Sequence, residues 1–406
     1  MRVGIVGFGG AGLAQYEHFQ SIEKCKVVAV YDPNQAGLDR ARSLSSSLFL
    51  SDDFEEFLRA GIDVVTICSP DRTHADYMAR CLNTGKHTLC EKPLTDSLDG
   101  CKKVLEAERK SPGVIAAVQH QMRFVPLYVK IREAIETGAL GKITYIEGYY
   151  VHNLTKRATL YDTWRFQDRA TPLVYSGCHF IDLLRWLLND EVAEVMGMAN
   201  NIAFPEYPES DLNVVLLRFR SGIIGKVITA FGAARPQDHS VRVYGTGKSV
   251  ENNLLFDKNG RFSVLSRPFF LDDGRAANPT FRNRFGSIRS HYKTAVVGML
   301  FETLMRFWNR KERDYAICSY PMRLYEHSFA VRASISDFVR AIRTGQRPKG
   351  TLAEAAKTVV TCLAGVEAYR TGEAVPVARY WIPELDAENN ERRYMHGIAV
   401  DARCSV

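Results

Sequence analysis

The chain begins MRVGIVGFGGAGLAQY, residues 1–16, and this stretch decides the fold of its first third. A short apolar run leads directly into GFGGAG, in which Gly7, Gly9 and Gly12 have the G-x-G-x-x-G spacing. The first glycine permits a tight turn, the second lets a ligand approach the backbone, and the third lets a helix pack closely. The pattern therefore predicts a strand, a turn and a helix whose N-terminus binds a pyrophosphate.

Strand and helix patterns alternate through the next hundred residues. Apolar runs at residues 27–31, 63–68 and 88–90 alternate with helical patterns at residues 11–23, 36–44 and 73–85. Gly85 is a natural C-cap for the last of these helices. Such alternation predicts a parallel, doubly wound Rossmann sheet, which we assign to residues 1–122.

Asp32 ends the second apolar run, where a carboxylate can accept hydrogen bonds from a ribose diol. The same charge repels a 2′-phosphate, and Pro33 and Asn34 supply no phosphate ligand. Arg40 and Arg42 could still reach such a phosphate. The expected cofactor is NAD, and NADP is the less favoured alternative.

The pattern changes after residue 122. A helix is expected at residues 126–136, followed by the strand patterns ITYIEGYYV, residues 143–151, and DLNVVLLRFRSGIIGKVITAF, residues 211–231. Their polar and apolar alternation predicts a largely antiparallel sheet with one face exposed to water. Two amphipathic helices, residues 328–345 and 352–372, each end at a glycine. Residues 123–406 are thus expected to form a second, α+β domain, giving an α/β protein overall.

Composition excludes several classes of protein. The nine cysteines include no C-x-x-C pair, which argues against a zinc site and a disulfide framework, and no metal is expected. The formal charge of +7 is spread along the chain, so no nucleic-acid partner is expected. No signal-peptide pattern or membrane-length apolar run is present, so we expect a cytoplasmic protein. Residues 273–320 predict a loop and an apolar helix packed on the sheet or another subunit, or alternatively on a membrane surface.

Further motifs follow GFGGAG in a fixed order. They are SPDRTH (residues 69–74), GKHTLCEKP (85–93), RFVP (123–126) and GCHFIDLL (177–184). Together they resemble the Gfo/Idh/MocA family of nucleotide-dependent oxidoreductases over both halves of the chain. The resemblance implies a Rossmann domain, a second domain with a large open sheet often used for oligomer contacts, and a sugar or polyol site between them. It thus makes residues 123–406 the domain for substrate binding and oligomerisation. It also implies a homodimer or homotetramer.

The resemblance makes Lys92 of the EKP motif a catalytic residue. An ammonium at the cofactor crevice can hydrogen-bond the reacting hydroxyl and polarise the incipient carbonyl. It also assigns Glu91, Ser69, Pro70 and His74 to the cofactor site. For His74, a position at the helix start without a chemical part is an equal alternative.

The stretch LVYSGCHFIDLLRW, residues 173–186, carries the family's catalytic histidine at His179. Asp182 follows three residues later on the same helical face, where it can pair with a ring nitrogen or an arginine. Many members of the family carry an aspartate where this chain has Tyr175. A phenol is neutral at pH 7, so Tyr175 cannot supply a negative charge, although it can donate or relay a proton.

Other residues are suited to a sugar ring. Arg123 follows the domain crossover, and TWRFQDR, residues 163–169, supplies Trp164 and Arg165 for stacking and hydrogen bonding. Further candidates for contact with the sugar ring are Tyr149, Tyr150, His152 and Asp168.

We therefore expect an NAD-dependent oxidoreductase that acts on a ring hydroxyl of a sugar, cyclitol or sugar derivative. Two alternatives stay open. One is redox-neutral glycoside cleavage through transient oxidation by bound NAD. The other is a catalytically silent sensor that regulates a protein partner through residues 273–320.

Overall fold

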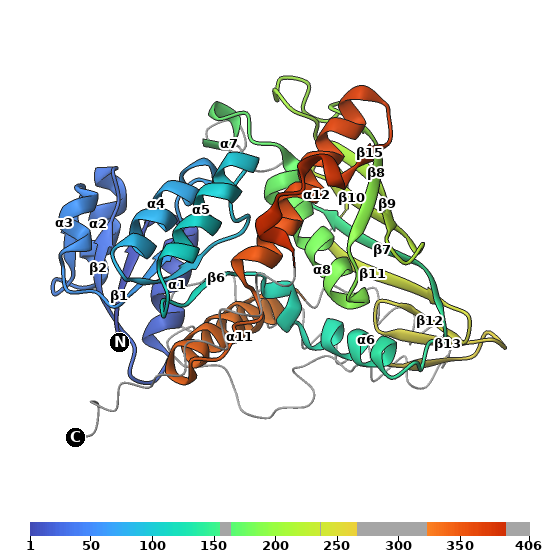
Figure 1. Cartoon of the computed structure of the whole chain (residues 1–406), viewed down its shortest axis with the longest axis horizontal. Helices are drawn as coiled ribbons and strands as arrows, with labels where there is room; N and C mark the ends of the chain where they lie inside the picture. The colour runs from blue at the N-terminus through green and yellow to red at the C-terminus, as the bar shows by residue number, and fades with distance from the viewer. Residues whose placement is uncertain (155–163, 236, 266–322, 387–406) are drawn as a thin grey trace.

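The computed structural model describes residues 1–154, 164–235, 237–265 and 323–386, and the predicted segment 273–320 lies outside them. The first sheet has six parallel strands in the order β3-β2-β1-β4-β5-β6 (Figure 1). The strands are β1 (Arg2–Val6), β2 (Lys26–Tyr31), β3 (Phe49–Ser51), β4 (Val64–Ile67), β5 (His87–Cys90) and β6 (Ala116–Val118). The helices between them are α1 (Gly10–Gln20), α2 (Gln35–Leu44), α3 (Phe54–Leu58), α4 (Asp71–Asn83) and α5 (Leu98–Lys110). The strand order reverses between β1 and β4, which is where open α/β sheets bind ligands.

The glycine-rich turn has the backbone that its spacing predicts. Gly7 has a φ of +81°, which a residue with a side chain rarely adopts. A Cβ atom on Gly12 would lie 2.1 Å from the carbonyl oxygen of Gly7, so only glycine fits there. A Cβ on Gly9 would meet nothing within 4 Å, which leaves this side of the turn open for a ligand.

The second sheet has nine strands in the order β14-β13-β12-β11-β7-β10-β9-β8-β15, and only the β7–β10 pair is parallel. The strands are β7 (Ile143–Val151), β8 (Val192–Asn200), β9 (Leu212–Phe219), β10 (Ile224–Ala230), β11 (Asp238–Gly245), β12 (Lys248–Glu251), β13 (Leu254–Asp257), β14 (Phe262–Val264) and β15 (Val375–Pro376). The fold class expected from the sequence is confirmed.

Helices join the two sheets. Those outside the first sheet are η1 (Gln121–Phe124), α6 (Pro126–Glu136), α7 (Trp164–Gln167), η2 (Leu173–Gly177), α8 (Cys178–Leu188), α11 (Arg323–Thr344) and α12 (Leu352–Thr371), with short turns η5 (Val377–Tyr380) and η6 (Pro383–Leu385) near the end. Helix α11 packs on the first sheet, since Val331, Ile335 and Phe338 share a core with Val3 and Ile5. The division of the chain at residue 122 stays a prediction.

The prediction that residues 352–372 form an amphipathic helix is wrong in one respect. Helix α12 ends at Gly372, as expected, but thirteen of its twenty residues are buried. It lies between the two sheets (Figure 1) and contacts α5 and β6 on one side and α8 and β8 on the other. A helix that is packed on both sides needs no polar stripe.

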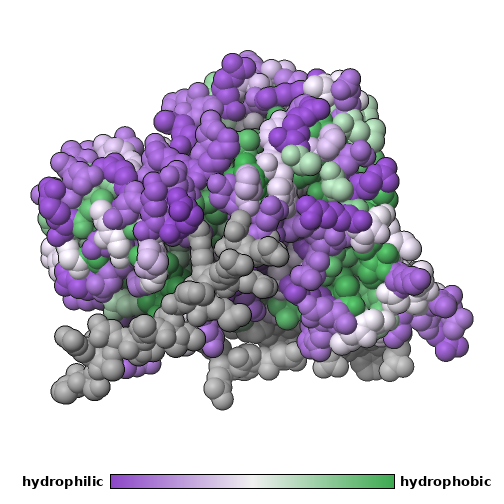
Figure 2. Space-filling model, in the orientation of Figure 1, coloured by the Kyte–Doolittle hydropathy of each residue, from purple (hydrophilic) through white to green (hydrophobic). Residues whose placement is uncertain are grey.

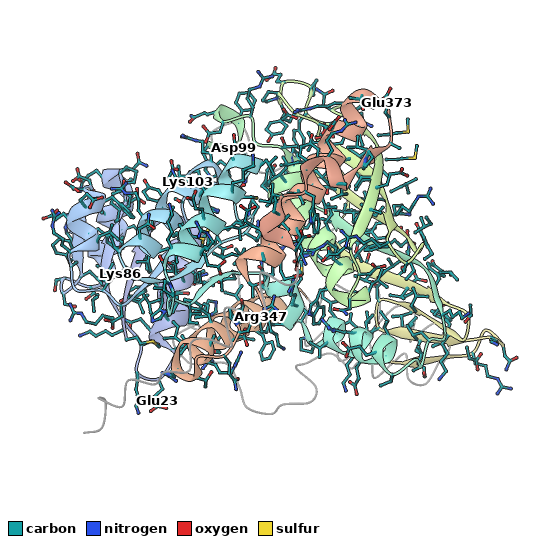
Figure 3. All side chains as sticks on the ribbon, in the orientation of Figure 1. Glu23, Lys86, Asp99, Lys103, Arg347 and Glu373 are labelled. Atoms are coloured by element: carbon teal, nitrogen blue, oxygen red, sulfur yellow. The ribbon has the colours of Figure 1, made fainter. Side chains whose placement is uncertain are left out.

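The surface toward the viewer of Figure 2 is mostly hydrophilic over the outer helices of the first sheet. Figure 3 shows Asp99 and Lys103 among the charged side chains that project from α5. Within the described ranges, no helix is long and apolar enough to cross a membrane. The same ranges contain no group of three or more side chains suited to hold a metal ion.

Candidate active site at the domain junction

Lys92 reaches from the first domain to the second. It follows β5, and its Nζ donates a hydrogen bond to the backbone carbonyl oxygen of Tyr175 at 2.8 Å. Tyr175 belongs to the π-helical turn η2, which runs directly into α8 and His179. The structure therefore brings the predicted lysine beside the turn that leads to the predicted histidine.

His74 fixes the loop that carries Lys92. The imidazole is fully buried, and its Nδ1 lies 2.7 Å from the carbonyl oxygen of Pro93 while its Nε2 lies 2.9 Å from that of Ser69. These contacts tie the SPDRTH motif to the EKP motif. For His74 the sequence left two interpretations open, a role at the cofactor site and a structural position at the start of the helix. These two contacts favour the structural position.

Asp32 lies beside the glycine-rich turn. Its carboxylate accepts hydrogen bonds from the backbone N–H groups of Phe8 (2.7 Å) and Asn34 (2.9 Å). Arg40 donates to the carbonyl oxygen of Phe8, and Arg42 pairs with an aspartate of its own helix. The open turn at Gly9 and the carboxylate at the end of β2 together fit a dinucleotide with an unmodified ribose.

Glu91 is held by two glutamines that the sequence analysis missed. Gln15 donates to its Oε1 at 3.2 Å and Gln119 at 2.8 Å, and Gln15 also donates to Gln119. Burial raises the pKa of Glu91, against the opposing effect of Lys92 and Gln15. Neither glutamine belongs to a motif, so only the folded chain brings them to this site.

His179 is the second residue of α8 and is 5% exposed. Its ring stacks on that of Tyr150, with centroids 5.5 Å apart and an interplanar angle of 10°. The rings of His152 and His239 also stack on Tyr150, with centroid distances of 4.4 and 4.6 Å. The Nε2 atoms of His152 and His239 are hydrogen-bonded at 2.8 Å. His239 was missed because the β7–β11 pairing, which is non-local, brings it opposite Tyr150.

The side chain of Tyr175 packs into an aromatic cluster. It stacks on Phe231 with centroids 5.7 Å apart, and the cluster also contains Phe204 and Tyr207. Burial, followed by the neighbouring Tyr207, raises the pKa of Tyr175 well above its ordinary value. The phenol is therefore neutral, as the sequence predicted, and the group that Tyr175 offers to Lys92 is its carbonyl oxygen.

Asp182 pairs with an arginine, which was one of its two predicted partners. Arg123 donates to both of its carboxylate oxygens, at 2.8 and 2.5 Å, and both side chains are buried. Thr358 of α12 also donates to Asp182, at 3.2 Å. The substrate contacts expected for Arg123 and Asp182 stay predictions. Their hydrogen bonds with each other favour a structural role for both residues at the domain junction.

Helix α7 carries the other predicted substrate residues. The Arg165 guanidinium lies 4.5 Å from the centre of the Trp164 ring and 5.1 Å from that of Tyr175. Asp168 pairs with Arg72 of α4 at 2.5 Å, which links α7 to the first domain. The structure thus brings Arg165 to the same junction as Lys92.

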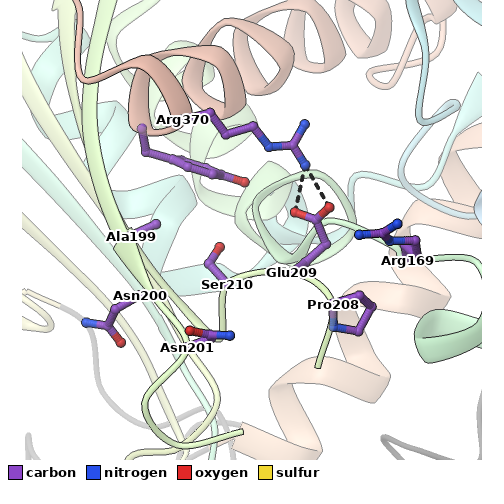
Figure 4. A pocket seen from close by; sticks show the side chains of 9 residues that line it. Arg169, Ala199, Asn200, Asn201, Pro208, Glu209, Ser210 and Arg370 are labelled. Carbon is purple, nitrogen blue, oxygen red and sulfur yellow. Dashed lines mark hydrogen bonds and ion pairs between the residues drawn. The ribbon is translucent and has the colours of Figure 1, made fainter. Parts of the chain in front are cut away.

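A separate surface pocket lies near the end of α12 (Figure 4). Arg370 pairs there with Glu209 at 2.7 and 2.8 Å. The lining residues are Arg169, Ala199, Asn200, Asn201, Pro208, Glu209, Ser210, Tyr369 and Arg370. They include none of the predicted site residues, so we place the chemistry at the junction.

Comparisons with known proteins agree with this geometry. Residues 1–120 match the model of an "Oxidoreductase family, NAD-binding Rossmann fold", and residues 128–251 match that of the "GFO/IDH/MocA C-terminal domain". The inositol 2-dehydrogenase of Rubrobacter xylanophilus is 29% identical over 62% of this chain and 71% of its own length. The myo-inositol 2-dehydrogenase of Thermotoga maritima is 28% identical over 67% of this chain and 83% of its own length.

Solved structures share the fold. The myo-inositol 2-dehydrogenase of Lactobacillus plantarum has a TM-score of 0.72 at 19% identity, covering 93% of this chain and 99% of that one. The scyllo-inositol dehydrogenase of Lactobacillus casei, solved with NAD(H) and scyllo-inositol, has a TM-score of 0.70 at 19% identity, covering 93% and 99%. Since the two models together match both domains in order, the chain belongs to the Gfo/Idh/MocA family of oxidoreductases, with an NAD-binding Rossmann domain.

Proposed function

We propose that the protein is an NAD-dependent dehydrogenase that oxidises one ring hydroxyl of a cyclitol to a ketone. The observation that carries the proposal is the hydrogen bond from Lys92 to the backbone of Tyr175. This bond supports the proposal because it joins Lys92, at the carboxyl edge of the sheet that bears the dinucleotide turn, to the helical turn that leads into His179. The matched relatives named above, which are inositol dehydrogenases, support a cyclitol as the substrate class.

Different residues of the chain would bind different parts of the cofactor. The turn at Gly7, Gly9 and Gly12 would hold the pyrophosphate, and Asp32 the ribose. When bound, NAD supplies the hydride acceptor.

At the reacting carbon, Lys92 donates a hydrogen bond to the substrate oxygen and stabilises the charge that develops there. His179 takes the hydroxyl proton during oxidation and returns it during reduction. Tyr150 orients the imidazole by stacking on it.

We also propose a homo-oligomer in the cytoplasm. The open face of the second sheet exposes Met196 (47%), Leu216 (44%) and Met198 (79%), and no described helix covers it. Large apolar side chains gathered on one face are typical of protein interfaces. The seven cysteines in the described ranges are all free thiols, which fits a reducing compartment.

The direct test is a panel of cyclitols, sugars and glycosides incubated with NAD while NADH and released products are both followed. A dehydrogenase forms NADH with one class, and Lys92→Ala abolishes this reaction. Product release without NADH would instead indicate redox-neutral glycoside cleavage. Cofactor binding without either reaction would contradict the proposal and favour a sensor.

A further inference from the structure

The side chain of Asp71 is largely enclosed, and none of the described residues makes a hydrogen bond to its carboxylate. Asp71 is the first residue of α4 and is 7% exposed. Its side chain does not cap its own helix, and no described side chain or backbone N–H donates to it. Its oxygens are not among the fully buried side-chain atoms that lack a partner, so they keep access to water and can accept a hydrogen bond from a ligand.

Two contacts fix the position of Asp71 at the domain junction. On one side, His74, one helical turn along α4, contacts the carbonyl oxygen of Pro93, next to Lys92. On the other side, the adjacent Arg72 pairs with Asp168, which follows the helix that carries Arg165. Lys92 of the first domain and Arg165 of the second both act electrostatically on the Asp71 carboxyl group.

Other acceptors near Lys92 are already engaged or neutral. Glu91 accepts hydrogen bonds from two glutamines, and Tyr175 carries a neutral phenol. Among the described residues near Lys92, Asp71 is thus a largely enclosed carboxylate to which no protein group donates a hydrogen bond.

We propose that Asp71 is a further residue of the substrate site, and that its carboxylate accepts a hydrogen bond from a ring hydroxyl of the polyol held beside Lys92. This rests on the proposed function, which requires a hydroxyl-rich substrate at that place. A carboxylate with an open acceptor orients such a ring and favours hydroxyl-bearing carbons over deoxygenated ones.

The electrostatic surroundings of Asp71 agree with this role. Burial raises its pKa, and His74, Lys92 and Arg165 act in the opposite direction. Perturbed carboxylates in clefts are typical of functional sites. The titratable and charged groups of the surrounding elements that interact electrostatically with it are His74, Cys90, Lys92, Asp96, Arg165, Cys178 and Tyr207.

The test compares Asp71→Asn and Asp71→Glu with Asp96→Asn, which makes the same chemical change at an exposed neighbour. We measure kcat and KM for the best cyclitol between pH 5 and 9, and the Kd of NADH by fluorescence. Asp71→Asn is expected to lower kcat/KM roughly 100-fold, to change the acid limb of its pH profile, which then depends on His179 without Asp71, and to leave the Kd of NADH within about threefold. Asp71→Glu restores part of the activity, and Asp96→Asn stays within about twofold of the wild type.

The outcomes separate the two proposals. If the wild type oxidises a cyclitol and Asp71→Asn does so within about threefold, with the same pH profile, the assignment of Asp71 is wrong and the proposed function stands. If Asp71→Asn and Asp71→Glu both unfold or lose NADH binding equally, Asp71 only stabilises the start of α4, which also overturns the assignment. If the wild type oxidises no polyol, the proposed function fails, and this inference fails with it.

Discussion

At Tyr175 the backbone and the side chain serve different parts of the molecule. The carbonyl oxygen accepts the hydrogen bond of Lys92, while the phenol lies in the cluster with Phe204, Tyr207 and Phe231. The sequence predicted correctly that Tyr175 brings no charge. It could not show that Lys92 contacts a main-chain atom, because every type of residue has the same backbone carbonyl oxygen.

This division gives a prediction for two variants of Tyr175. Tyr175→Phe keeps the carbonyl oxygen and the ring, so kcat/KM is expected to stay within about threefold of the wild type. Tyr175→Ala empties part of the aromatic cluster and is expected to lower the free energy of unfolding by about 3 kcal/mol. Steady-state kinetics and urea unfolding measure the two effects. A tenfold or greater loss of kcat/KM in Tyr175→Phe would restore the proton-relay role considered from the sequence.

At the scale of elements, buried charges join η1, α8 and α12. Arg123 and Arg185 are paired with Asp182, Glu191 and Glu354, and all of these side chains lie at or near the domain junction. Burial opposes the ionisation of Glu354, but Arg185 and Arg123 outweigh it and lower its pKa to about 2. The motif GCHFIDLL predicted only that Asp182 has a partner, since the ends of this network are more than a hundred residues apart.

His120, at the start of η1, makes this network sensitive to acid. Burial lowers its pKa from 6.5 to about 4, although Asp182 opposes the shift. The unfolded chain therefore binds a proton below pH 6.5 that the folded chain binds only near pH 4. Stability is present above pH 6.5 and is lost as the pH falls, by about 2 kcal/mol between pH 6.5 and 4.5.

Urea unfolding at a series of pH values measures this loss. His120→Asn is expected to flatten the stability curve between pH 6.5 and 4.5. His87→Asn is the comparison variant: burial also lowers the pKa of His87, but the ring is less enclosed, so this variant is expected to flatten the curve less than His120→Asn does. Equal slopes in the wild type and His120→Asn would contradict this account of the junction.

At the scale of the whole molecule, local sequence patterns predicted where helices and strands lie, whereas tertiary contacts determine which elements pack against them. The strand at residues 143–151 and the helix at residues 126–136 have the bounds read from the sequence. The burial of α12 on two sides and the packing of α11 on the first sheet depend on contacts across the chain, which no local periodicity reports. The same limit explains why Gln15, Gln119 and His239 were missed.

The open face of the second sheet predicts how subunits assemble. Met198 and Ile202 are almost equally exposed, at 79% and 82%, but only Met198 lies on a strand of that face. Met198→Lys is expected to weaken self-association roughly tenfold or more, because it puts a charge into an apolar contact. Ile202→Lys is the control and should leave the oligomer intact. Light scattering over a dilution series compares them, and equal masses for both variants and the wild type would exclude this face as the interface.

The central claim is that hydride passes from a cyclitol carbon to NAD at the junction of Lys92 and His179. The most direct measurement uses a cyclitol deuterated at its ring carbons and follows the label into the reduced cofactor by mass spectrometry. We predict one deuterium per reduced nicotinamide in the wild type, and no labelled cofactor with Lys92→Ala. Consumption of the cyclitol without label in the cofactor, or the absence of any reaction across the inositols, would contradict the account.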